Sequence, residues 1–125
     1  MAPTERPLEW IGSSYKDLMA LPAAVRRFFG YALSLAQASD QHDAAKVLTG
    51  FGSAGVLEVV EYDRSGTYRA VYTVKFEEAV FVLHCFQKKS KRGIATPKED
   101  RAIIHARLKV AEALAKDLRH EKTSH

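Results

Sequence analysis

The chain has 125 residues and is 46% hydrophobic, which predicts a single domain over residues 1–125 with loose ends at 1–7 and 120–125. Lys and Arg (19) exceed Asp and Glu (15), and the net charge of +4 favours an acidic partner. No apolar run reaches the roughly 18 residues of a membrane helix, and the first residues lack the apolar core of a secretory signal. The single Cys85 cannot form an internal disulfide. We therefore expect a cytoplasmic protein with no membrane association.

The first part of the chain carries the signals of two helices. A short strand is expected at residues 8–11, and a short helix at 15–20 with Ser14 as its N-cap. Pro22 suits the first position of a second helix, which ends near residues 39–40. Apolar residues recur in this second helix at helical spacing: Val25, Phe28, Phe29, Ala32, Leu33 and Ala36. We expect both helices to form a hairpin over one face of a sheet.

The middle of the chain is typical of a β-meander. Residues 41–55 have no periodicity and are expected to form a loop, and strands are expected at 56–62, 67–76 and 79–87. Short connections favour antiparallel pairing, and the N-terminal strand can pair with one edge. Residues 96–99 form a capping box that opens a third helix. The predicted fold is α+β, with two N-terminal helices and a C-terminal helix around a small, mainly antiparallel sheet.

Positive side chains gather where the last strand ends. The cluster consists of Lys88, Lys89, Lys91 and Arg92. Arg69 and Lys75 lie on the preceding strand, so a basic sheet face is expected. Such a surface favours a polyanion such as a nucleic acid.

Three motifs resemble one protein family. They are Gly66-Thr67-Tyr68-Arg69 on one strand, the run Leu83-His84-Cys85-Phe86-Gln87-Lys88-Lys89-Ser90 ending the next, and Thr96-Pro97-Lys98 opening the last helix. With the order of the elements, they resemble the RelE/ParE superfamily of bacterial toxins, and most closely its HigB-like, phage-derived branch. The resemblance covers about residues 8–115.

The resemblance implies a toxin of a type II toxin–antitoxin module that cleaves mRNA in the ribosomal A site. It implies a cognate antitoxin, commonly a helix-turn-helix DNA-binding protein in this branch, as partner. The same superfamily holds proteins that poison DNA gyrase, so the fold does not select the target. A gyrase poison, an inactive relative kept for its antitoxin complex, and a generic nucleic-acid-binding α+β domain remain alternatives.

Metal-independent RNA cleavage uses the 2′-hydroxyl of the substrate as nucleophile, so the protein must supply cations and proton carriers, and no cofactor is expected. The resemblance makes Arg69 the first choice for phosphate binding, because it occupies the family's strand position, and its planar fork fits phosphate. The alternative is an ion pair with Glu58 or Glu61. Lys89 is assigned to catalysis beside Arg69. RNA contacts are expected from Lys46, Lys88, Lys91 and Arg92.

The proton carriers are harder to assign. His84 is a candidate general acid or base, although its apolar surroundings favour a packed, hydrogen-bonded ring. Tyr68 and Tyr72 could stack a base or pack against the sheet. His120 and His125 have no motif around them, and no His/Cys/Asp/Glu set shows metal-ligand spacing.

Overall fold

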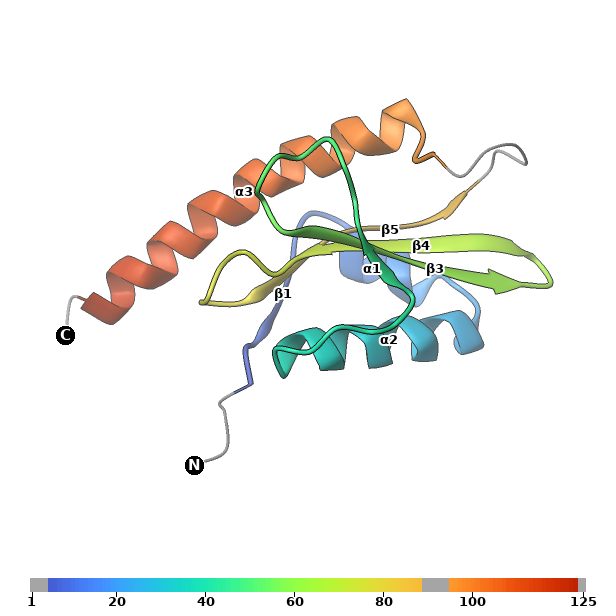
Figure 1. Ribbon diagram of the computed structural model, residues 1–125, viewed down its shortest axis with the longest axis horizontal. Helices are drawn as coiled ribbons and strands as arrows, with labels where there is room; N and C mark the ends of the chain where they lie inside the picture. The colour runs from blue at the N-terminus through green and yellow to red at the C-terminus, as the bar shows by residue number, and fades with distance from the viewer. Residues whose placement is uncertain (1–4, 89–94, 124–125) are drawn as a thin grey trace.

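The computed structural model describes residues 5–88 and 95–123 (Figure 1). These residues form β1 (Leu8–Trp10), α1 (Ser14–Met19), α2 (Ala23–Gln37), β2 (Ala45–Val47), β3 (Val56–Asp63), β4 (Gly66–Thr73), β5 (Val80–Lys88) and α3 (Lys98–Thr123). The five strands form one sheet in the order β1-β5-β4-β3-β2. β1 runs parallel to β5 and every other pair is antiparallel. The predicted α+β fold and the edge position of the first strand are confirmed.

The sheet separates two apolar cores. Figure 1 shows α2 on one side of the sheet and α3 on the other. Val25, Phe29 and Leu33 of α2 pack against Tyr72 and neighbouring residues of one sheet face. A second cluster joins α3 to the other face: Ile104, Ala111, Ala115, Val56, Val71, Phe81, Leu83 and Phe86. The apolar stripe predicted for the second helix therefore does cover one face of the sheet.

A β-bulge in β5 decides which side chains face α3. Val71 pairs with His84, whereas the next residue, Tyr72, pairs with Val82, so Leu83 is an extra residue on β5. The bulge places Leu83 and His84 on the same face, because both contact α3 or its core. Each later residue of β5 therefore lies on the face opposite to the one that simple alternation predicts.

Several boundaries differ from the predictions. β2 lies inside the predicted loop at 41–55, where pairing with β3 defines a strand that its own residues do not signal. α1 begins at Ser14, whose hydroxyl donates to the Val82 carbonyl at 3.1 Å instead of capping the helix. Arg6 donates to the carbonyls of Val74 and Phe76, which ties residues expected to be loose to the connection between β4 and β5. α3 continues to Thr123, beyond the expected fraying point.

Cys85 is buried in the α2-side core, and burial raises the pKa of its thiol to about 12. The thiol of the unfolded chain ionises near 9.0, so the unfolded state binds fewer protons between these two values. We therefore expect the free energy of unfolding to fall as the pH rises from about 9.0 towards 12. Urea denaturation at a series of pH values measures this fall. Cys85→Ala should lose stability less steeply than the wild type, and equal slopes would contradict the assignment.

Candidate functional site

A cavity of about 560 Å³ lies over the outer part of the sheet, on the face that α3 covers. Its described lining comes from the β2 region, β3, β4, the residues before α3 and the first turn of α3: Ala44, Lys46, Val47, Leu48, Thr49, Glu58, Val60, Tyr62, Arg69, Ala95, Thr96 and Arg101. Strand and helix segments far apart in sequence thus meet around one opening. Three of the lining side chains are cationic and one is a carboxylate.

The strand register explains why the polar residues meet. Lys46 of β2 lies opposite Glu58 of β3, and Arg69 of β4 lies opposite Val60, two residues from Glu58. Side chains two residues apart on a strand share a face. Lys46, Glu58 and Arg69 therefore project from the same face of three neighbouring strands, beyond the apolar cluster under α3.

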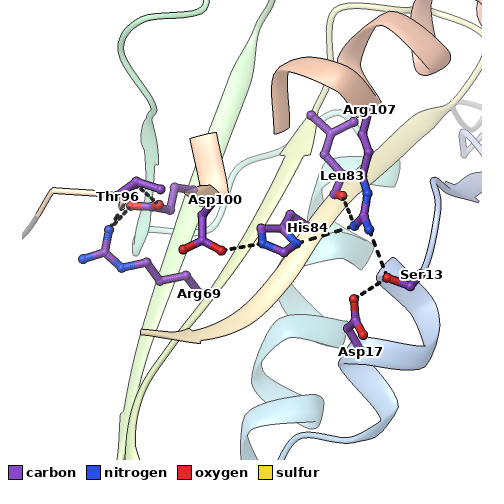
Figure 2. Close-up of polar contacts among 9 residues, drawn as sticks. Ser13, Asp17, Arg69, Leu83, His84, Thr96, Asp100 and Arg107 are labelled. Carbon is purple, nitrogen blue, oxygen red and sulfur yellow. Dashed lines mark hydrogen bonds and ion pairs between the residues drawn. The ribbon is translucent and has the colours of Figure 1, made fainter. Parts of the chain in front are cut away.

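Arg69 forms the floor of the cavity. Its guanidinium donates to Glu58 Oε1 at 3.0 Å and to Thr96 Oγ1 at 3.3 Å, and the Thr96 hydroxyl donates to Glu58 Oε2 at 2.8 Å. Figure 2 shows Arg69 reaching towards Thr96. Arg69 is 3% exposed, and its Glu58 partner carries a side chain that is 11% exposed. The ion pair with Glu58, one of the two expected alternatives for Arg69, is confirmed.

Further cations surround this pair. Lys46 is exposed on the edge strand, and Arg101 of α3 donates to the Thr49 carbonyl at 2.8 Å while lying over the Phe51 ring. Lys88 projects from β5 on the same face, opposite Thr67. Burial and the nearby charge of Arg69 lower the pKa of Lys88, and Glu58 opposes this shift. Lys88 therefore adds positive charge on the sheet face that carries Arg69.

His84 contacts α3 through both ring nitrogens (Figure 2). Nε2 lies 2.8 Å from Asp100 Oδ1, and Nδ1 lies 3.5 Å from the Arg107 guanidinium. The ring is 6% exposed and stacks on Phe86 with centroids 4.5 Å apart. These contacts join β5 to the first turns of α3. The packed, hydrogen-bonded arrangement is the one that the structure shows for His84.

Arg107 extends this network to α1. It donates to the Leu83 carbonyl at 2.9 Å and to the Ser13 hydroxyl at 3.0 Å, and Ser13 in turn donates to Asp17 at 2.7 Å. Figure 2 shows the polar chain from Asp100 through His84 and Arg107 to Asp17. The network fixes the N-terminal half of α3, and with it the position of Thr96 and Arg101 over the cavity.

The predicted site residues fall into three groups. Arg69 and Lys46 line the cavity, and Lys88 lies on the same sheet face. His84 lies beside Asp100, outside the described lining. Lys89, Lys91 and Arg92 lie outside the described residues. Tyr68 and Tyr72 are buried in the core under α2, on the opposite face, so packing against the sheet is the alternative that the structure shows for them.

Among the lining residues that sequence reasoning missed are Glu58, Tyr62, Thr96 and Arg101. Glu58 and Tyr62 share the alternation of β3, so pairing this strand with the one that carries Arg69 would have placed them together. The capping box and the family motif both place Thr96 at the start of the last helix, and neither indicates that its side chain reaches the cavity. No sequence signal indicates that Arg101 reaches the cavity.

Among the residues described, no group of three or more His, Cys, Asp and Glu is arranged to hold a metal ion, and no helix could cross a membrane.

Comparisons with known proteins agree with this architecture. A double arginine-to-alanine mutant of the E. coli toxin RelE, solved in the free state, superposes with a TM-score of 0.52 and 24% sequence identity. The match covers 70% of this chain and 87% of that one, so the chain has a RelE-like fold. No curated protein matches the sequence. The family model described as phage derived protein Gp49-like (DUF891) matches residues 16–109, more than half of the chain. The chain therefore belongs to the Gp49-like family of phage-derived proteins.

Proposed function

We propose that this protein is the toxin of a type II toxin–antitoxin module and that it cleaves mRNA on the ribosome. The observation that carries the proposal is the cavity floored by Arg69 and flanked by Lys46 and Arg101. A RelE-like fold and membership of the Gp49-like family support it. The HigB-like branch, with a helix-turn-helix antitoxin as partner and the cytoplasm as location, is part of the same proposal.

The cavity suits the phosphate of an RNA strand. An arginine whose fork is already oriented by Glu58 and Thr96 needs little rearrangement to meet a phosphate. Lys46 and Arg101 add positive charge on two sides. Preorganised cations of this kind stabilise the extra negative charge of a pentavalent phosphate. Lys89 as a catalytic residue, and Lys88, Lys91 and Arg92 as RNA contacts, remain proposals from the sequence.

We further propose Glu58 as the proton acceptor for the attacking 2′-hydroxyl. It is the carboxylate among the described lining residues, and it touches the phosphate-binding Arg69. A general base must lie within hydrogen-bond reach of the proton that it removes, so this location is the main support. His84, whose ring is held between Asp100 and Arg107, is proposed to position α3 rather than to transfer a proton.

Induced expression with transcript-end mapping tests the proposal. We expect growth arrest together with new 5′ ends inside translated messages, at preferred codons. The matched control is the same reporter transcript with its start codon removed, which should remain uncut because no ribosome reads it. Cuts in both transcripts would contradict ribosome dependence. Arrest without cuts would contradict the nuclease and favour a target such as DNA gyrase.

A further inference from the structure

Tyr62 is the most exposed large apolar side chain of the protein as described, and it lies at the rim of the cavity. The side chain is 73% exposed and belongs to β3, near the turn into β4. It shares the face of Glu58 and Val60, and Val60 lies opposite Arg69. Residues diagonal to one another on paired strands are about 7–8 Å apart, within reach of an aromatic side chain. Tyr62 therefore flanks the phosphate-binding floor.

The cavity has an apolar side beside its charged floor. Val47 at the end of β2 is 70% exposed, and Val60, Leu48 and Ala95 also belong to the lining. Leu48 is buried, whereas Val47 is open to water in the free protein, and covering such exposed apolar surface with a ligand is favourable. The charged and apolar parts adjoin within one opening. A nucleotide has the same division, with a phosphate next to a flat base.

We infer that Tyr62 stacks one base of the single-stranded RNA whose phosphate binds at Arg69. The inference rests on the proposed function and adds the subsite that holds the base. An exposed ring offers a face to any base, so it supplies affinity with little sequence preference. Any codon preference would then come from other contacts between the toxin, the message and the ribosome. Tyr62, rather than the buried Tyr68 and Tyr72, is the strand tyrosine available for this role.

Two assays with three variants test the inference. The first measures binding of a fluorescent single-stranded 2′-O-methyl oligoribonucleotide, which cannot undergo attack by a 2′-hydroxyl. The second measures cleavage of a ribosome-bound message, with or without an abasic nucleotide beside the cut.

Tyr62→Ala should weaken binding and slow cleavage by about 5- to 150-fold, the range expected for loss of one stacked base. Tyr62→Phe keeps the ring and should behave as the wild type. Tyr31→Ala removes a tyrosine of α2 that is 58% exposed and should change neither value.

The abasic message distinguishes stacking from other contacts. On this message the wild type and Tyr62→Ala should cleave equally slowly, because the partner of the ring is missing. Equal behaviour of Tyr62→Ala and the wild type on normal RNA in both assays would overturn the inference and leave the proposed function standing. An equal loss in Tyr62→Phe would point to the hydroxyl and overturn stacking. A wild type that neither binds nor cleaves RNA would overturn the proposed function and the inference together.

Discussion

Replacing Arg69 with alanine is expected both to slow RNA cleavage strongly and to destabilise the folded protein. The side chain of Arg69 is 4% exposed and pairs with Glu58 at 3.0 Å. Removing one partner of a buried pair leaves the other charge uncompensated, which costs about 3–5 kcal/mol. We expect a loss of stability at the lower end of this range, because Glu58 keeps its hydrogen bond from Thr96. Loss of a preorganised donor to the reacting phosphate lowers the cleavage rate by about 10²–10³-fold. Urea denaturation and single-turnover cleavage measure the two effects.

Two further variants separate catalysis from folding. Arg69→Lys keeps a cation beside Glu58 but loses the planar fork, so stability should stay near that of the wild type while cleavage falls. The double variant Arg69→Ala with Glu58→Gln removes both charges and should recover most of the lost stability without recovering cleavage. Arg64→Ala, at an exposed position in the turn between β3 and β4, is the matched control and should change neither value. Because this variant also lacks the proposed base Glu58, full cleavage by it would show that neither Arg69 nor Glu58 takes part in the chemistry.

The helices and main strands could be predicted because their own residues carry the signal. The stripe from Val25 to Ala36 has helical spacing, and the runs around β3, β4 and β5 are rich in β-branched and aromatic residues. β2 could not be predicted in the same way. Its three residues, Ala45–Val47, follow no alternation of their own, and pairing with β3 makes them a strand. Tertiary context, rather than local propensity, fixes that edge of the sheet.

The candidate site was predictable only in part. Alternation along β4 correctly places Arg69 and Tyr68 on opposite faces of the sheet. In β5, however, the bulge at Leu83 shifts the alternation of side chains between the two faces. Without the bulge, His84 and Lys88 would share the face of Val82, under α2. One inserted residue moves them to the face of α3 and of the cavity. Nothing in a period-two pattern of apolar residues reveals such a bulge.

The α3 side of the cavity depends on a contact between distant segments. Thr96 and Arg101 enter the site because the Asp100–His84 contact and Arg107 hold the start of α3 against β5. A capping signal identifies where a helix begins, but it does not give the direction in which the helix packs. For this reason the start of the helix could be predicted from the sequence, whereas the positions of Thr96 and Arg101 in the site could not.

The chemistry of the proposed cleavage depends on one atom of the RNA. In the proposed reaction the 2′-hydroxyl of the nucleotide before the cut attacks the phosphate and Glu58 accepts its proton. The bond between phosphorus and the 5′-oxygen breaks, and that oxygen leaves as a hydroxyl after taking a proton from water. A message with hydrogen in place of that hydroxyl has no nucleophile, while its fit to the ribosome and to the cavity is almost unchanged. An attack by water would be indifferent to the substitution, so the two mechanisms give opposite results.

The most direct measurement is therefore cleavage of a ribosome-bound message that carries a single 2′-deoxynucleotide at the mapped site. The matched all-RNA message and a message with the 2′-deoxynucleotide one position downstream serve as controls. We expect cutting of both controls, fragments ending in a 2′,3′-cyclic or 3′-phosphate, and no cut at the substituted position. Cutting of the substituted message at the same site and rate as the all-RNA message would contradict the proposed mechanism.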